Sequence, residues 1–301
     1  MEDHRIIGHN SPLNSGHGCA NVPQRQAKAA SHPPSILPRS CRVPENVLLI
    51  VFLFGITWGS FLNVCIYRIP LGKSIVLPAS HCPQCSQAIR WFDNIPLLGW
   101  VLLRGRCRHC HAAISPIYPL VELLAGMLAI QVIGHFGLNW QNLTLILLGY
   151  AFIVLAFIDF QHYILPDVIT LPGIALGLIL AWTGWSAPPL ATLQEAFLGL
   201  AIGGGGLWGF AWLFQKITGK VGMGLGDVKL LAMIGAWMGW QSLPFTLFFA
   251  SLLGTTVGIL WMIAAHRNRS QPIPFGPYLV GAAWAYLYIG QSLTQWYLGK
   301  G

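Results

Sequence analysis

Charged residues are scarce in this chain of 301 residues. Only 9% of the residues are Asp, Glu, Lys or Arg, and 54% are hydrophobic, whereas a soluble domain carries about 25% charged residues. This shortage excludes a water-soluble globular protein and indicates a polytopic membrane protein. The formal net charge of +8 does not indicate nucleic-acid binding, because the basic residues gather in short segments outside the apolar runs.

The sequence also lacks a Rossmann fingerprint in a strand–turn–helix context. Its glycine run at 203–206 lies inside an apolar stretch, where it indicates a close-packing site or a kink rather than a phosphate cradle. Residues 1–44 have neither the pattern of a signal peptide nor that of a transit peptide. Their polar composition predicts a disordered tail, unless translation starts further downstream.

Apolar runs of about 20 residues predict about eight membrane-spanning helices. The runs lie at residues 47–67, 117–136, 143–159, 168–185, 192–214, 227–241, 243–265 and 276–298. Lys and Arg concentrate between the first and second, the fifth and sixth, and the seventh and eighth runs. Because positive residues mark the cytoplasmic side, these segments are expected in the cytosol and both termini outside.

Two carboxylates stand at the ends of such runs. Asp159 closes one run in the context FIDFQHYILPD, and Asp227 opens another in the context GMGLGDVKLL. An ionisable side chain at the edge of a span is a candidate functional group, and the predicted orientation brings both acids to the same membrane face. A carboxylate pair can share a proton and activate water, as in aspartic proteases, so these two are the predicted catalytic residues.

Four residues beside the two acids are predicted to support them. Gly224 and Gly226 precede Asp227, and glycine permits positive φ and the close approach of an extended substrate. Asp167 follows a proline at a predicted helix start and is expected to cap that helix. Lys229 lies on the turn after Asp227 and is expected to extend toward the interface.

Two CxxC pairs lie between the first two spans, at Cys82 and Cys85 and at Cys107 and Cys110, separated by 21 residues. Two such pairs predict a tetrahedral four-cysteine zinc site, and cytosolic thiols stay reduced, which favours a metal over disulfides. Four thiolates leave no open position for water, so the zinc is expected to be structural. The predicted fold class is therefore an all-α polytopic membrane protein with a cytosolic zinc-binding loop between its first two spans.

Six stretches in chain order resemble the type IV prepilin peptidases, the bifunctional leader peptidases and N-methyltransferases that process precursors of pilins and pseudopilins. Within about residues 47–265 these stretches are GSFLNVCIYRIP, the two CxxC pairs, DNIPLLGWVLLRGRC, ISPIYPLVELLAG, FIDFQHYILPD and GMGLGDVKLL. The resemblance implies a GxGD-class aspartic membrane protease that cleaves after a glycine at the cytosolic face of the bacterial inner membrane. It also implies methylation of the freed amine from S-adenosylmethionine, with prepilins and the lipid bilayer as partners.

The resemblance places methyl transfer on the cytosolic loop, where Asp93, Asn94, Arg104 and Gly105 are the candidates for binding the methyl donor. An arginine can hold the carboxylate of the donor in a bidentate pair, but Arg104 can also orient the protein and contact anionic lipid. Glu122, within the second span, is expected to have either a structural role or a role in methyl transfer.

These expectations divide the chain into four parts. Residues 1–44 are expected to form a disordered tail. Residues 45–136 are expected to hold the first span, the zinc and methyltransferase loop, and the second span. Residues 137–265 are expected to form an aspartic peptidase membrane domain, and residues 266–301 a last loop and span.

Two alternatives for the function stay open: a peptidase without methyl transfer, and a proton-coupled membrane transporter. No internal repeat aligns the segments that carry the two acids, and the acids lie at the membrane edge rather than the midplane, so a transporter is disfavoured.

Overall fold

The computed structural model describes residues 43–185, 189–219, 224–265, 274–290 and 292–293. The predicted tail at 1–44 lies almost wholly outside the described residues. In chain order the helices are α1 (Glu45–Arg68), η2 (Trp91–Asn94), α2 (Leu98–Leu102), α3 (Ile117–Phe136), α4 (Trp140–His162), α5 (Asp167–Thr183), α6 (Leu193–Leu200), η3 (Ala201–Gly206), α7 (Leu207–Thr218), α8 (Leu225–Met238), α9 (Ser242–Ala265), α10 (Gly276–Ala285) and η4 (Tyr286–Gly290). The described part contains two isolated β-bridges but no strand, so the all-α fold class is confirmed.

Five helical stretches in the described residues are long and apolar enough to cross a membrane. They are α1, α3, α4, α9 and the continuous stretch Leu193–Thr218, which consists of α6, the π-helix η3 and α7. The apolar helix α5 has 17 residues and α8 has 14, and the last predicted span at 276–298 extends into residues outside the described part. The multi-pass membrane architecture is confirmed, while the count of eight spans stays a prediction.

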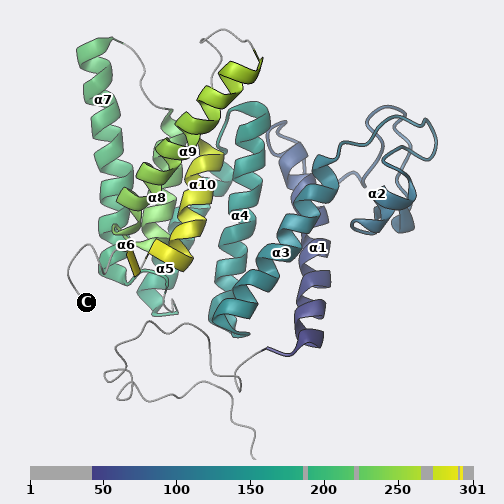
Figure 1. Ribbon diagram of the computed structural model, residues 1–301, viewed down its shortest axis with the longest axis horizontal. Helices are drawn as coiled ribbons and strands as arrows, with labels where there is room; N and C mark the ends of the chain where they lie inside the picture. The colour runs from purple at the N-terminus through teal and green to yellow at the C-terminus, as the bar shows by residue number, and fades with distance from the viewer. Residues whose placement is uncertain (1–42, 186–188, 220–223, 266–273, 291, 294–301) are drawn as a thin grey trace, which may run out of the picture. The chain divides into compact units, whose positions relative to one another are not determined.

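The first three long helices form one side of the helical bundle (Figure 1). α1 packs along α3, and α4 packs against both of them. Only residues 137–139 separate α3 from α4, so the two helices are antiparallel neighbours. The start of α3 and the end of α4 therefore lie at the same end of the bundle. The loop between α1 and α3, residues 69–116, is attached at this end and is called the cysteine loop below.

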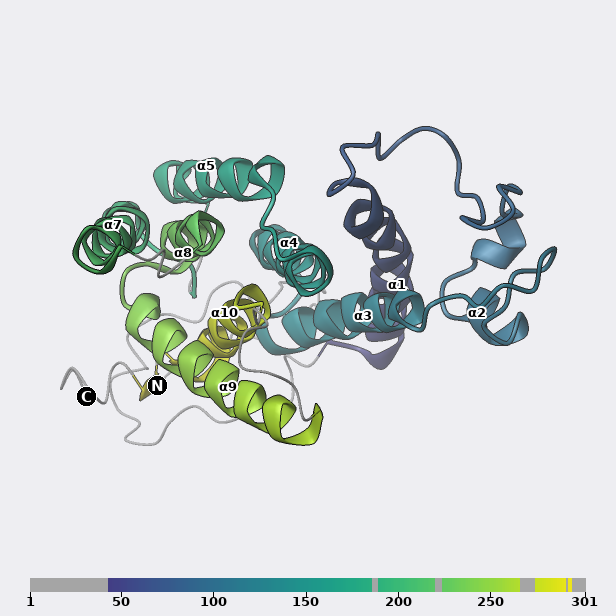
Figure 2. The same cartoon turned by 90° about the horizontal axis from the view of Figure 1, so that it is seen from above.

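α8 is the most enclosed helix of the other side (Figure 2). It packs against α5, α6, η3, α9 and α10, and residues 230–238 are all buried. Gly199 of α6 and Gly235 of α8 permit this, because a Cβ atom on either would meet the backbone of the other. The indole Nε1 of Trp237 donates a hydrogen bond to the carbonyl of Gly173 in α5 at 2.8 Å. α8 is thus held on two sides, by close backbone packing against α6 and by a hydrogen bond to the backbone of α5.

The glycine run predicted as a packing site or a kink forms the π-helix η3. Gly203 is buried, and a Cβ atom there would lie 2.7 Å from the carbonyl oxygen of Leu231 in α8. Gly205 faces open space. Close packing is confirmed at Gly203, and the π-helical stretch η3 lies where the chain contacts α8.

Candidate functional site

The C-terminal end of α4 positions Asp159. The helix ends at His162, and the C-cap residue Tyr163 adopts a left-handed φ of 57° and donates its N–H to the Asp159 carbonyl at 2.9 Å. The Asp159 side chain is buried, with 6% relative exposure. Its Oδ2 accepts a hydrogen bond of 2.8 Å from the backbone N–H of Gly276, the first residue of α10.

Asp227 lies in the first turn of α8. The backbone of Gly224 forms a hydrogen bond with its carboxyl group, and the carboxylate of Asp159 is near enough for a direct electrostatic interaction between the two acids. Two carboxylates that interact electrostatically do not ionise independently, so one of them can stay protonated while the other is ionised. The structure thus brings together the two acids that the sequence singles out.

The glycines before Asp227 serve close packing rather than unusual backbone angles. Gly224 is extended, with φ −71° and ψ 139°, and Gly226 lies inside α8. Neither has a positive φ, so that part of the expectation is wrong. A Cβ atom on Gly226 would lie 3.1 Å from Cβ of Leu165, and one on Gly224 would lie 3.4 Å from Oδ2 of Asp227. Close packing is therefore present at Gly226, while the approach of an extended substrate to these glycines stays a prediction.

Asp167 and Lys229 form an ion pair between the starts of α5 and α8. Lys229 Nζ donates to the two carboxylate oxygens of Asp167 at 2.6 and 2.8 Å. Asp167 lies in the first turn of α5, as expected of an acid that the helix dipole favours. The expected cap is wrong, because the N-cap residue is Pro166 and no side chain forms a capping hydrogen bond. Lys229 is likewise not a free interfacial lysine. The pair links the helix that carries Asp227 to α5.

Gly276 contacts the pair of acids, and the sequence interpretation missed it. A Cβ atom at this position would lie 2.7 Å from Oδ2 of Asp159, so only glycine fits without a shift. The signal in the sequence is a glycine between Phe275 and Pro277 at the start of an apolar run. That pattern predicts a helix start, with proline in the first turn, but it does not reveal a contact with α4.

The four cysteines form one cluster. Their sulfur atoms all lie within 4.8 Å of one another, and Sγ of Cys82 is 3.8 Å from Sγ of Cys110. A tetrahedral zinc ion with Zn–S bonds of about 2.3 Å has S···S edges of about 3.8 Å. Hydrogen bonds from the backbone of Cys110 and of His109 lower the pKa of the Cys107 thiol to about 6, which favours the thiolate that binds metals. The cluster therefore fits a single tetrahedral ion.

The same backbone turn builds both cysteine pairs. In the first, the N–H of Cys82 donates to the carbonyl of Gln87, the N–H of Ser86 donates to the carbonyl of Cys82, and Ser86 has a φ of 56°. The second pair repeats these contacts at Cys107 and at His111, whose φ is 54°. Each turn directs two sulfurs to one point, which explains why the pairs can share an ion.

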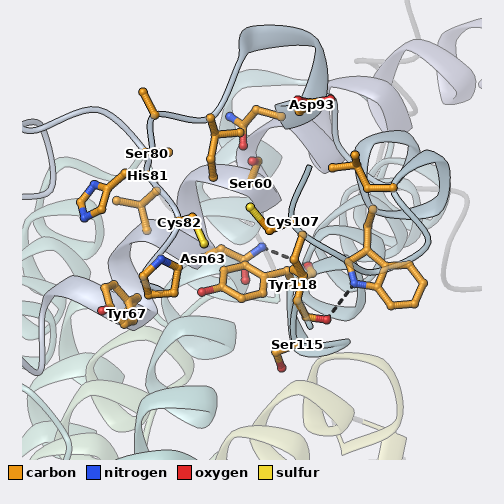
Figure 3. Close-up of a pocket in the computed structure, with 18 of the residues that line it drawn as sticks. Ser60, Asn63, Tyr67, Ser80, His81, Cys82, Asp93, Cys107, Ser115 and Tyr118 are labelled. Atoms are coloured by element: carbon orange, nitrogen blue, oxygen red, sulfur yellow. Dashed lines mark hydrogen bonds between the residues drawn. The ribbon is translucent and has the colours of Figure 1, made fainter. Parts of the chain in front are cut away.

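A cavity of about 1070 Å³ lies between α1, the cysteine loop and the start of α3 (Figure 3). Tyr67, Trp100 and Tyr118 contribute aromatic rings to its lining. Asn63 donates to the carbonyl of Tyr118 at 3.0 Å, and the indole N–H of Trp100 donates to the carbonyl of Ile114 at 3.2 Å. These bonds fix the orientation of one lining side chain on α1 and one on the cysteine loop.

Two of the four residues expected to bind a methyl donor line this cavity. Asp93 and Asn94 belong to the lining, and Arg104 and Gly105 do not. Arg108 donates to both carboxylate oxygens of Asp93, at 2.9 and 2.5 Å, and these hydrogen bonds lower the pKa of Asp93. The arginine that binds a carboxylate in this loop is therefore Arg108 rather than Arg104, and that carboxylate is the side chain of Asp93 rather than a group of the methyl donor.

Glu122 of α3 also lines the cavity and is 8% exposed. Its Oε2 accepts a hydrogen bond from the N–H of Leu97 at 2.8 Å, and the Ser60 side chain also hydrogen-bonds to the carboxyl group. Leu97 directly precedes α2 and has a φ of 61°. One carboxyl group thus connects α1, α3 and the cysteine loop.

The sequence matches the bacterial peptidase A24 N-terminal domain over residues 53–136 and the type IV leader peptidase family over residues 146–259. Among curated proteins, the prepilin leader peptidase/N-methyltransferase of Stutzerimonas stutzeri is 40% identical over 85% of this chain and 95% of its own length. The proteins of the same name from Aeromonas salmonicida (strain A449) and Pseudomonas aeruginosa are 42% and 41% identical, each over 85% of this chain and over 95% and 94% of their own lengths. The chain belongs to the type IV leader peptidase family. No solved structure matches it.

In this member of the leader peptidase family, the two matched regions separate the two candidate sites. The cysteine cluster and the cavity lie in the first region, and Asp159 and Asp227 lie in the second. Gly276 lies beyond both. Membership of a peptidase family favours the enzyme over the transporter as the interpretation of the two acids.

Proposed function

We propose that this chain is a prepilin leader peptidase that also N-methylates its processed substrate, the two activities that the names of its relatives give for those proteins. The observation that carries the proposal is the carboxylate pair Asp159 and Asp227. The two groups interact where α4, α8 and α10 meet. A paired set of acids at the end of apolar helices suits hydrolysis of a peptide bond at the membrane edge.

In the proposed hydrolysis the two acids act together, one as base and the other as acid. The ionised member of the pair takes a proton from water, whose oxygen attacks the scissile carbonyl carbon, while the protonated member donates its proton to the carbonyl oxygen. Return of a proton to the leaving nitrogen then releases the new N-terminal amine. The N–H of Gly276 holds one oxygen of Asp159 and leaves the other oxygen for the shared proton.

Cleavage is proposed at the cytosolic face of the bacterial inner membrane. Asp159 lies at the end of α4, on the same end of the bundle as the cysteine loop. That loop is rich in Lys and Arg, and positive residues mark the cytoplasmic side. The acids therefore face the compartment in which precursors are made.

The cysteine cluster is proposed to hold one structural zinc ion through Cys82, Cys85, Cys107 and Cys110. The support is the fit of the sulfur spacing to a tetrahedral four-thiolate site. The ion closes the cysteine loop and thereby shapes the cavity, because Cys82 and Cys107 are also lining residues.

The cavity is proposed to bind the methyl donor S-adenosylmethionine beside Asp93 and Asn94. Its volume of about 1070 Å³ reaches the upper end of the range of about 300–1,000 Å³ for ligand sites, so there is room for the donor and the end of a peptide. The aromatic rings lining it suit an adenine ring and a positively charged sulfonium. Arg104 and Gly105, with φ of 50° and 66°, are proposed to form the turn between α2 and the second cysteine pair.

The test is reconstitution of the purified full chain in liposomes with a synthetic prepilin and S-adenosylmethionine. Mass spectrometry should show removal of the leader after its terminal glycine and one added methyl group on the new N-terminus. Without the methyl donor, only leader removal is expected. An uncut precursor would contradict the proposal, and a cut but unmethylated product would support the peptidase-only alternative.

A further inference from the structure

Glu122 is a carboxylate built into the wall of the cavity by the packing of two helices. Gly59 of α1 lies so close to α3 that a Cβ atom there would be 2.6 Å from Cα of Glu122. This contact brings Ser60 to the carboxyl group from one side, and the N–H of Leu97 approaches from the other. The group is thus held in one orientation at the cavity rather than on a mobile surface.

In the part of the chain that the structure describes, Glu122 has no basic partner. The ion pairs found there join Arg108 to Asp93 and Lys229 to Asp167. A buried carboxylate without a positive partner is costly, and an acid inside a membrane helix is a candidate functional group. Glu122 therefore makes this part of the cavity complementary to a cation.

Methyl transfer to an amine presents two cations, the sulfonium of the donor and the ammonium of the substrate. Glu122 lies in the second turn of the candidate span α3, whereas Asp93 lies on the cysteine loop. The amine freed by cleavage emerges where α4 ends, and that end adjoins the start of α3. The depth of Glu122 in the helix therefore matches the amine of a membrane-inserted substrate better than it matches a soluble donor.

We propose that Glu122 binds the α-amino group of the cleaved substrate and accepts its proton before methyl transfer, an inference that rests on the function proposed above. The ammonium gives one proton to the Glu122 carboxylate and becomes a neutral amine. The nitrogen lone pair of that amine then forms the new C–N bond, and the C–S bond of the sulfonium donor breaks with its electron pair going to sulfur. The donor leaves as a neutral thioether, the product is a secondary ammonium, and Glu122 returns its proton to water.

The test separates amine binding from a purely structural role. In Glu122→Gln the amide oxygen can still accept the Leu97 N–H, so the contact that holds the cysteine loop survives while the negative charge is lost. The probe is a peptide of a mature pilin N-terminus with a free α-amine, compared with the same peptide N-acetylated. Binding of each is measured to the full chain in detergent, without methyl donor.

The wild-type protein should prefer the free amine by about 10-fold or more, as expected for a hydrogen bond to a charged group, and Glu122→Gln should lose that preference. Methylation of the pre-cleaved peptide should fall with a raised KM and a lowered kcat, while leader cleavage stays normal. Glu122→Asp keeps the charge and should retain part of the preference. Glu195→Gln, which removes a carboxylate from the start of α6, should behave as wild type.

If Glu122→Gln keeps both the amine preference and normal methylation, the inference is overturned. Loss of methylation with an unchanged amine preference would also contradict it, because Glu122 would then serve only the loop. These results differ from failure of the proposed function, in which the wild-type chain itself would neither cleave nor methylate.

Discussion

Asp159 is oriented by a hydrogen bond that comes from a distant part of the chain. The donor is the N–H of Gly276, at the start of α10, and the bond is buried. The N-terminus of a helix carries unpaired N–H groups and a partial positive charge, so α10 stabilises negative charge on Asp159. Gly276 must also be small, because a Cβ atom at this position would lie against the carboxylate of Asp159.

Replacing Gly276 with Ala is therefore expected to impair cleavage. The new Cβ would lie 2.7 Å from Oδ2 of Asp159, so one of the two groups must move, and a misplacement of about 1 Å can cost about 100-fold in rate. Leader cleavage by purified protein measures the effect. Gly281→Ala is the matched control, because a Cβ there meets nothing within 4 Å; equal activity of the two variants would contradict the positioning role.

The pair between Asp167 and Lys229 is expected to contribute little to stability. The two side chains are 56% and 36% exposed, and exposed ion pairs contribute about 0.2–1 kcal/mol. A double-mutant cycle with Asp167→Asn and Lys229→Met, read by denaturant unfolding in detergent, should give a coupling free energy in this range. A coupling above about 3 kcal/mol would mean that the pair behaves as a buried one.

For single residues, the sequence predicts the two paired acids well, but it predicts the residues that contact them poorly. Asp159 and Asp227 stand out because carboxylates are costly at the ends of apolar runs. Gly276 does not stand out, because its contribution is a backbone N–H whose contact depends on how α10 packs against α4. Glu122 is visible as an acid in a span, yet its contact with Leu97 follows only from the path of the cysteine loop.

Among the structural elements, the cysteine pairs are the clearest case of local sequence fixing local structure. Each pair has the same turn, the same hydrogen bonds and one residue with positive φ after its second cysteine. The spacing of the cysteines therefore predicts the cluster without knowledge of the helices. The cavity beside it requires α1 and α3 as well, and no pattern in the cysteine loop predicts it.

The purified chain is expected to contain about one zinc ion, which serine at Cys107 should largely remove. Because Cys107 lines the cavity and the dyad lies on α4 and α8, Cys107→Ser should reduce methylation far more than cleavage. Elemental analysis and the two activity assays measure this. Cys65→Ala, at a buried thiol of α1 outside the cluster, should keep its zinc; a metal-free wild-type protein with full methylation would contradict the structural role.

The hydropathy of the sequence predicts the positions of the helices closely, but it predicts their lengths less well. The predicted span at 192–214 corresponds to Leu193–Thr218. The predicted span at 227–241 becomes a helix of 14 residues that ends before Gly239, whose φ is 81°. Glycines on α6 and α8 let this helix pack inside the protein. Hydropathy measures how apolar a segment is, but it does not tell whether protein or lipid surrounds it.

Over the whole molecule, α4 connects the two candidate sites. It packs against α1 and α3, which line the cavity, and against α10, which holds the Asp159 carboxylate. The distribution of Lys and Arg in the sequence predicts both sites at one end of the bundle, but only the packing shows that α4, which carries Asp159, lies against the helices that line the cavity. This arrangement fits the proposed function, in which the substrate is cut at one site and methylated at the other.

Hydrolysis of the leader by Asp159 and Asp227 is tested by isosteric removal of each charge. In Asp159→Asn and Asp227→Asn, leader cleavage should fall by about 10²–10⁴-fold or more, the contribution expected of acid–base groups. Zinc content and methylation of a pre-cleaved pilin peptide should stay normal, which shows that the protein is folded. Cleavage of the intact precursor by Asp227→Asn at the wild-type rate would show that Asp227 takes no part in hydrolysis.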